Sequence, residues 1–364
     1  MSSQTATGGH EPEGRALLAP WRGRLTRRHL VVALALLWLL DGALQFQPDM
    51  YSRSSNSFLA TVLSYNTMGR PNLLTELIRF AVLSTYGTAG RQVVFNTLAA
   101  VVQLGIGVGL IWRRTERLAL AASFVWALFP WVVGEGLGQM PWPQASMAVQ
   151  GSPGAAALYM ILALVLWPRR TEPPRAGQSV ADGGLLRGRG ARAVWAAVWA
   201  GTGALELEHA NWASDALSAE IRNNAAGEPS WLAHLDRSVA HLLYGHGTEV
   251  VLVVLVVQVV AALWVLRPMT RRAGLALGIG VSLVYWVIGQ NFGGILTGTA
   301  TDPNLGPVMV LFALTLWPSG TPSSEAVAEL ASPAAAELDE PRPDLRDALP
   351  SGATRSSVPP VLPS

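Results

Sequence analysis

The sequence WLLDGALQ at residues 38–45 recurs as WAGTGALE at residues 199–206, and this repetition decides the fold. Two more blocks recur in the same order: PWVVGE at 130–135 as YWVIGQ at 285–290, and LVLWP at 164–168 as LTLWP at 314–318. An internal repeat constrains the architecture more strongly than any local signal. Because every matching block lies in or beside an apolar stretch, the sequence predicts two copies of one helical membrane unit.

The composition is that of a membrane protein. Half of the 364 residues are hydrophobic, 14% are charged and the mean hydropathy is +0.32, whereas soluble domains are about 25% charged. Cysteine is absent, which excludes thiolate nucleophiles and Cys-ligated metal centres. No phosphate-binding glycine loop, Ser-His-Asp arrangement or basic nucleic-acid face is present. The sequence therefore indicates no nucleic-acid partner and no enzyme class, and it identifies no cofactor.

Eight apolar segments are candidates for crossing the bilayer, which takes about 20 residues. The fourth and eighth are short, but each begins near a capping residue and a proline, Ser152-Pro153 and Asp302-Pro303, and ends at Trp-Pro. The segments are 30–46, 93–112, 118–138, 154–167, 193–208, 248–266, 273–292 and 304–317.

The arginines predict the orientation of the chain. Seventeen of the 26 basic residues precede the first segment or lie between segments two and three, four and five, or six and seven. The positive-inside rule then predicts a multi-pass protein of the cell membrane with both termini in the cytoplasm. With four segments per copy, the two copies run in the same direction, as parallel repeats.

The domain prediction follows the repeat. Arg27-Arg28 before the first segment is compatible with a cleaved signal, but the duplicate of that segment lies in mid-chain, which argues against cleavage. The polar segments have too little apolar sequence to fold alone. We predict a cytoplasmic N-terminal tail at 1–28, a first membrane repeat at 29–168, a cytoplasmic linker at 169–192, a second membrane repeat at 193–318 and an acidic Pro/Ala/Ser-rich tail at 319–364.

The connections after the first and fifth segments are each about 40 residues, too long for plain turns. Each contains an amphipathic stretch that predicts a short helix on the outer face of the membrane. The apolar arcs comprise Trp231, Leu232, Leu235, Val239 and Leu242 in the second copy, and Leu73, Leu74, Leu77 and Ala81 in the first.

Histidines gather in the second outer region. His234 and His241 are seven residues apart, within about 20° of one helical face. Imidazoles with carboxylates could bind Zn²⁺ or Cu²⁺ or respond to pH, and the alternative is an amphipathic surface without a ligand. The metal candidates are His209, His234, His241, His246, Glu206 and Glu249.

Polar residues also lie within the apolar segments, where they are costly and usually face a cavity or a partner. Asp41 and Glu135 are replaced by Thr202 and Gln290 in the second copy, so polarity is kept and charge is not. A proton or ligand site in the first copy and a structural polar bridge are both compatible with this pattern. Gln103 and Gln258 occupy equivalent places and are predicted to form interhelical hydrogen bonds.

Glycines four residues apart predict close helix contacts. The pairs are Gly105/Gly109, Gly134/Gly138, Gly274/Gly278 and Gly289/Gly293.

Each half resembles the four-helix DoxX/DoxD-type membrane module. The resemblance rests on a first segment with a glycine-bearing motif (Asp41-Gly42, Thr202-Gly203), a long outer connection, a basic inner turn (Arg113-Arg114, Arg271-Arg272) and a short last segment. It implies association with membrane redox or quinone-linked complexes. The tandem duplication departs from the single module, and no catalytic residue is carried over.

These patterns leave three functions open, of which the last is a membrane enzyme that needs a cofactor the sequence does not reveal. The first is a non-catalytic or accessory subunit of a membrane complex, whose partners are the lipid bilayer and other subunits. The second is a transporter or binder of a small solute or metal, with a site at the repeat interface and the outer histidines. An accessory subunit predicts a dry, filled centre, whereas a carrier predicts a polar cavity.

Overall fold

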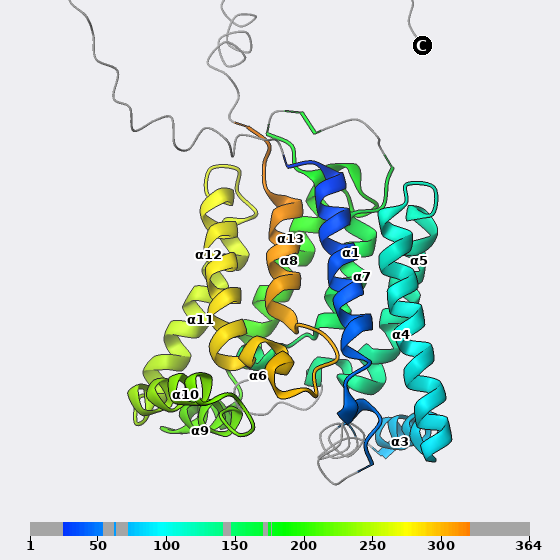
Figure 1. The fold of residues 1–364 in the computed structure, drawn as a ribbon. Coiled ribbons are helices and arrows are strands. Elements are labelled where there is room, and N and C mark those ends of the chain that lie inside the picture. The colour runs from blue at the N-terminus through cyan, green and yellow to red at the C-terminus, as the bar shows by residue number, and fades with distance from the viewer. Residues whose placement is uncertain are drawn as a thin grey trace, which may run out of the picture. The chain divides into compact units, whose positions relative to one another are not determined.

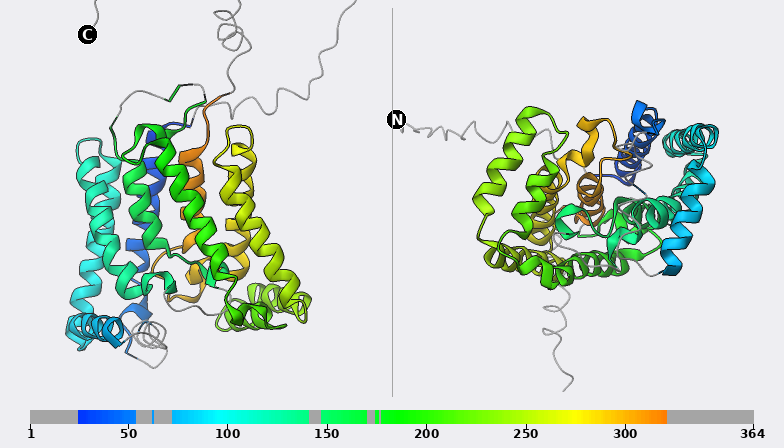
Figure 2. Two further views of the ribbon diagram at one scale, coloured as in Figure 1. Left: turned by 180° about the vertical axis from the view of Figure 1, so that it is seen from behind. Right: turned by 90° about the horizontal axis from the view of Figure 1, so that it is seen from below.

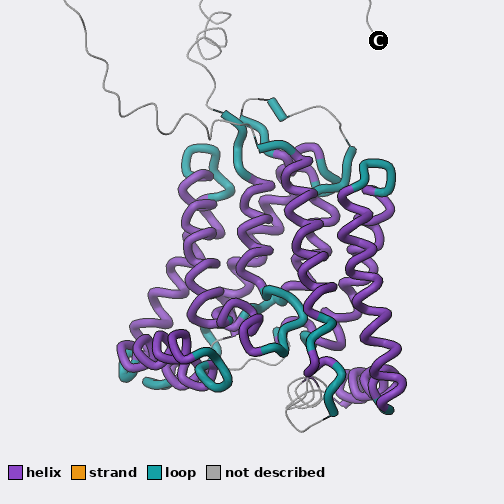
Figure 3. Tube along the Cα trace, in the orientation of Figure 1, coloured by secondary structure: helices purple, strands orange, loops and turns teal. Residues whose placement is uncertain are grey.

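The computed structural model describes residues 25–53, 62, 72–140, 147–169, 174–175 and 177–320, and within these ranges every regular element is helical (Figures 1 and 3). Each of the eight apolar segments forms a helix. Their bounds are α1 Arg27–Leu44, α4 Ala89–Ile111, α5 Glu116–Phe129, α7 Ala155–Val165, α8 Arg187–Leu205, α11 Gly247–Trp264, α12 Arg271–Val284 and α13 Leu305–Leu316.

Four helical segments are long and apolar enough to cross a bilayer: Ala89–Ile111, Glu116–Gly134, Gly247–Trp264 and Arg271–Thr297. The other four helices are too short, or carry too many charged residues, to be counted with these. Helices α1 and α8 carry arginines in their first turns, and α1 also carries Asp41. Helices α7 and α13 have 11 and 12 residues, or roughly 17–18 Å at 1.5 Å per residue. The described part of the chain is therefore all-helical, with four segments capable of crossing a membrane.

The long helices pack as two groups around a shared core. In the first helix group α1 packs on α4, α4 on α5, and α5 on α7; in the second helix group α8 packs on α11, α11 on α12, and α12 on α13. Helix α13 also contacts α7 and α1. Most side chains of α7 and α13 are buried, as expected of helices that are apolar all round. These two short helices are therefore the centre of the bundle.

The N-termini of α7 and α13 are capped differently from the prediction. Ser152 and Asp302 do not cap them; the capping positions are Gly154 and Asn304. Instead, a side chain from the preceding helix accepts a hydrogen bond from the second N–H of each helix. Glu135 Oε1 accepts from Ala156 N at 3.0 Å, and Gln290 Oε1 accepts from Gly306 N at 3.3 Å. These remote acceptors satisfy donors that a local cap would otherwise satisfy.

A widened π-helical turn follows both α5 and α12, at Pro130–Gly134 and Tyr285–Gly289. A tryptophan in each turn donates to a proline carbonyl just before a central helix. Trp131 Nε1 lies 3.0 Å from Pro153 O, and Trp286 Nε1 lies 2.7 Å from Pro303 O. The end of each third helix is thus tied to the start of the fourth.

Short helices lie across one end of the bundle, as the views from the side and from below show (Figures 1 and 2). The α-helices there are α3 Asn72–Tyr86, α6 Met147–Gln150, α9 Ala216–Asn224 and α10 Ser230–Leu243, and the 3₁₀ turns are Pro48–Met50, Leu137–Gln139, His209–Trp212 and Asn291–Thr297. Helix α10 buries Leu232, whereas Trp231 and Leu242 of the predicted arc are exposed. Exposed apolar groups at this end suit a membrane interface.

The predicted linker is more ordered than its composition indicates. A 3₁₀ turn at Val180–Gly183 buries Val180 and Ala181. Backbone hydrogen bonds join Leu185 N to Leu164 O and Ser319 N to Gln178 O. The segment is therefore held by the bundle, which supplies the apolar contacts that it lacks alone. The two predicted tails, apart from residues 25–28 and 319–320, lie outside the described residues.

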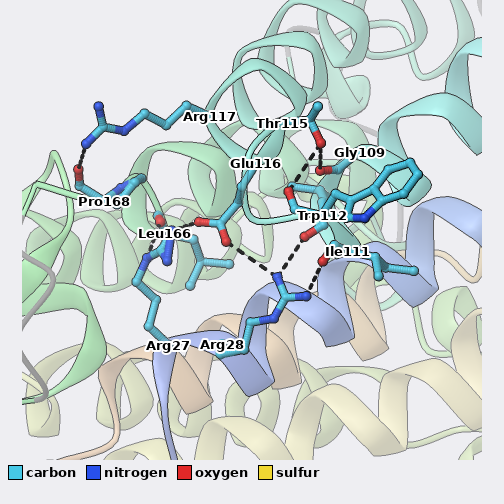
Figure 4. Close-up of polar contacts among 11 residues, drawn as sticks. Arg27, Arg28, Gly109, Ile111, Trp112, Thr115, Glu116, Arg117, Leu166 and Pro168 are labelled. Atoms are coloured by element: carbon cyan, nitrogen blue, oxygen red, sulfur yellow. Dashed lines mark hydrogen bonds and ion pairs between the residues drawn. The ribbon is translucent and has the colours of Figure 1, made fainter.

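An ionic cluster closes the opposite end of the first helix group (Figure 4). Arg27 pairs with Glu116, and its Nε donates to Leu166 O at 2.9 Å, at the end of α7. Arg28 lies 3.5 Å from Glu116 and donates to Leu110 O and Ile111 O at the end of α4. The first turn of α1 thus satisfies carbonyls that two other helix ends leave free.

Candidate functional site

The first helix group and the segment before α13 line a partly open cavity of about 160 Å³. In this measure one water occupies about 10–15 Å³, so the cavity is large enough for several waters or a small molecule. The side chains that define its chemistry come from α1, α4, α5, α7 and the segment before α13: Trp38, Asp41, Gln45, Phe95, Gln103, Trp126, Phe129, Glu135, Tyr159 and Asp302.

Three carboxyl groups face this cavity. Asp41 is only 2% exposed and extends from the last turns of α1. Its Oδ1 and Glu135 Oε2 are buried without a hydrogen-bond partner among the described residues. No Arg or His is among the described residues that line the cavity. A buried carboxylate without a cation or sufficient donors is unfavourable. The arrangement therefore calls for protons or a positively charged ligand.

The third carboxyl group, Asp302, comes from the connection before α13. Thr301 Oγ1 donates to its Oδ2 at 2.8 Å, and Asn304 N donates to its Oδ1 at 2.7 Å. Burial raises the pKa of the Asp302 carboxyl, although these two hydrogen bonds oppose the rise. The sequence interpretation treated Asp302 only as a helix cap. The useful signal was that the equivalent residue in the first copy is the uncharged Ser152.

Aromatic side chains form much of the remaining wall. Tyr159 packs on Trp38 with ring centroids 4.5 Å apart, and its hydroxyl interacts with the Asp41 carboxyl. Phe95 lies 5.3 Å from both Tyr86 and Phe129. Aromatic faces carry partial negative charge and attract cations, most strongly when water is excluded. A cavity lined by aromatic rings and carboxylates is suited to an organic cation.

The corresponding region of the second helix group is nearly filled. Its cavity has a volume of about 10 Å³ and is lined by residues that include Trp199, Thr202, Tyr285 and Gln290. Gln290 Nε2 donates to Val149 O at 3.2 Å, while its Oε1 accepts from Gly306 N. Because this space holds at most one water, the binding-sized cavity belongs to the first group.

The two candidate intramembrane glutamines behave differently. Gln258 is fully buried, and its Nε2 donates to Glu206 Oε1 at 3.2 Å and to the Tyr285 hydroxyl at 3.1 Å. Gln103 lines the cavity, and its Oε1 has no hydrogen-bond partner among the described residues. The Oε1 of Gln258 is likewise without a partner among the described residues, so the two glutamines differ in the hydrogen bonds of their amide nitrogens and in that Gln103 faces the cavity.

The structure does not bring the metal candidates together. His209, His234, His241 and His246 are all exposed, as is Glu249. Glu206 is instead buried in the contact with Gln258. Within the described part of the chain, no group of three or more His, Asp or Glu side chains could hold a metal ion.

Comparison of the chain with protein-family models, curated proteins and solved structures found no match.

Proposed function

We propose that this protein binds a small organic cation within the membrane, in the cavity of the first helix group, as a binding protein or carrier. The observation that carries this proposal is the buried carboxyl set of Asp41, Glu135 and Asp302, in which Asp41 Oδ1 and Glu135 Oε2 lack hydrogen-bond partners and no Arg or His lines the cavity among the described residues. A cationic ligand supplies the missing charge, and a proton can replace it when the cavity is empty.

The residues that line the cavity suit an organic cation better than a metal ion. Bare divalent ions need several oxygen or nitrogen ligands at about 2.0–2.6 Å, a grouping that the described residues do not form. The aromatic faces of Trp38, Tyr159 and Phe95 would instead contact the alkyl surface around an ammonium group. A primary or methylated amine with a small apolar body satisfies both parts of the cavity.

We also propose that the chain crosses the cell membrane eight times, as two tandem parallel repeats with both termini in the cytoplasm. The two π-helical turns, the two Trp-to-proline hydrogen bonds and the remote caps from Glu135 and Gln290 support this layout, because each occurs at equivalent positions. Helices α1 and α8 would place their arginines in the cytoplasmic interface and their remaining turns in the bilayer.

An accessory-subunit function is favoured by a different observation. Helices α7 and α13 are in contact, and both contribute buried apolar side chains to one core, among them Leu158, Leu162, Val308 and Phe312, which matches a filled centre. That function gives no role to Asp41 Oδ1 or Gln103 Oε1, which are buried without a hydrogen-bond partner among the described residues. Cation binding accounts for both features, with the second helix group serving as a scaffold.

The test measures ligand binding to the full chain in nanodiscs by tryptophan fluorescence, since Trp38 and Trp126 line the cavity. The probes are choline and its uncharged carbon isostere. We expect saturable choline binding that Asp41→Asn weakens at least tenfold and that Glu206→Gln, a matched buried carboxyl outside this cavity, leaves within twofold. Equal affinity for choline and the isostere, or no saturable signal with either, would refute the proposal.

A further inference from the structure

A second cavity, of about 230 Å³, adjoins the first. It is lined by the polar residues Gln139, Gln150, Ser152 and Asn304, with glycine backbone between them, and we call it the vestibule. The vestibule and the first cavity share Gly134, Glu135 and Asp302. The two spaces therefore meet at a pair of carboxyl groups.

The vestibule lies toward the end of the bundle that carries α3, α9 and α10. Its lining comes from the connections that follow α5, precede α7 and precede α13, which all lie at that end (Figure 2). Gly151 and Gly154 adopt positive φ of 117° and 100°, and a Cβ at these positions would collide with Asn304 Oδ1 and Glu135 Oε2. Glycine thus lets the backbone pass close to the side chains that line the space.

The opposite route from the first cavity is closed. Along α1, the turns between Asp41 and the N-terminus bury Leu34, Val31 and Leu30 in the apolar core. Beyond them, Arg27 and Arg28 bind Glu116 and the ends of α4 and α7. The vestibule, by contrast, adjoins the first cavity.

We propose that the vestibule is the site through which a cationic solute reaches the first cavity, and that Glu135 and Asp302 select for positive charge at the junction. This inference rests on the proposed function, because it takes an organic cation as the solute. A cation passing the junction exchanges part of its hydration for two carboxyl groups, whereas an anion meets only repulsion when they are ionised.

The natural absence of cysteine permits a direct test. Ala99→Cys places a thiol on the wall of the first cavity, and Leu242→Cys places one on the exposed face of α10. Intact cells are treated with two membrane-impermeant methanethiosulfonates of similar size, one bearing trimethylammonium and one bearing sulfonate. The full-length protein is then purified, and the labelled fraction is measured by mass spectrometry against time.

We expect Ala99→Cys to react at least tenfold faster with the trimethylammonium reagent than with the sulfonate reagent. This ratio of rates is divided by the same ratio for Leu242→Cys. Adding Asp302→Asn should remove most of this preference, and free choline should slow the reaction. Equal normalised rates for the two reagents would overturn the charge selection. Labelling of Ala99→Cys only in inside-out vesicles, or in neither orientation, would overturn the route.

Val133→Cys, also on the cavity wall, repeats the measurement if Ala99→Cys is poorly folded by size-exclusion chromatography. The outcomes separate the two proposals, because labelling reports access without requiring stable binding. Selective labelling without choline binding would leave the route standing and refute the proposed function. Choline binding with unselective labelling would refute charge selection at the junction and leave the proposed function standing.

Discussion

Individual carboxyl groups give the clearest information about function. Leaving a buried polar atom unpaired costs about 1–3 kcal/mol of folding stability, and more for a charged group. A purely structural role for Asp41 and Glu135 would not offset this cost. Their charge within apolar segments was visible in the sequence. Asp302 was not predicted as a cavity residue, because its position beside Pro303 looks like a helix cap and only the tertiary contacts of α13 bring it to Asp41.

Asp236 should make stability depend on pH. It is fully buried on α10, and its Oδ2 accepts from Asn291 at 3.0 Å. Burial raises the pKa of its carboxyl, although Asn291 and Arg237 oppose the rise. The folded state thus holds the proton more tightly than the unfolded state, whose pKa is about 4. Stability contributed by the protonated group is complete below that pH and is lost as pH rises through the raised folded pKa.

The Asp236→Asn variant should therefore show a flatter dependence of unfolding temperature on pH as the pH rises above about 4. Thermal unfolding of the detergent-purified protein measures this. The exposed Asp215→Asn variant is the control and should keep the slope of the wild type. An unchanged slope in Asp236→Asn would contradict the expected burial effect.

Two glycines on α12 allow a test of how closely this helix packs on α8. A Cβ on Gly278 would lie within van der Waals overlap of the Trp195 ring, whereas one on Gly280 would meet nothing within 4 Å. We expect Gly278→Ala to destabilise the protein by about 1–3 kcal/mol through overpacking. Gly280→Ala, in the same helix, should be neutral or slightly stabilising. Equal unfolding temperatures for the two variants would show that α12 and α8 are not in close contact.

At the scale of helices, the apolar segments predicted which elements exist but not their ends. Helix α8 begins at Arg187 rather than near Ala193, because the preceding 3₁₀ turn packs on the bundle and extends the helix. The glycine spacing was informative for Gly274 and Gly278, where a Cβ would meet neighbouring tryptophans, but not for Gly105, which has open space. Spacing gives the face of a helix and leaves its neighbour undetermined.

The ionic cluster on α1 yields a prediction for helix packing. Glu116→Gln would leave Arg27 without its counter-charge in a partly buried position, with a side chain 24% exposed. Lost hydrogen bonds to charged groups cost about 1.5–3 kcal/mol, so we expect a loss within that range. The neighbouring Arg117→Gln, which removes an exposed 3.4 Å contact to Pro168 O, should change stability by less than about 0.5 kcal/mol. Similar unfolding temperatures for the two variants would contradict this ranking.

At the scale of the whole molecule, the described residues from 25 to 320 form one compact unit rather than two separate bundles. The repeat in the sequence predicted two similar sets of helices. It did not predict that α7 and α13 meet at the centre, since periodicity does not specify which faces pack together. The likeness to a DoxX-type module stays a prediction.

The eight-span layout makes a prediction about topology. A reporter fused after Trp317 should be cytoplasmic, and one inserted near Gln144, which lies outside the described residues, should be extracytoplasmic. Alkaline phosphatase and green fluorescent protein fusions measure the two sides. The reverse assignment at either site would rule out the proposed layout.

The position of Asp302 in the chain has a consequence for biosynthesis. The ribosome synthesises α1, α4, α5 and α7 before α13 and the residue that precedes it, so the cavity lacks one of its three acids until residue 302 has been added. A nascent chain interrupted before residue 302 would also leave α7 without its central neighbour. Under the proposed function, cation binding would therefore require the late helix to be in place.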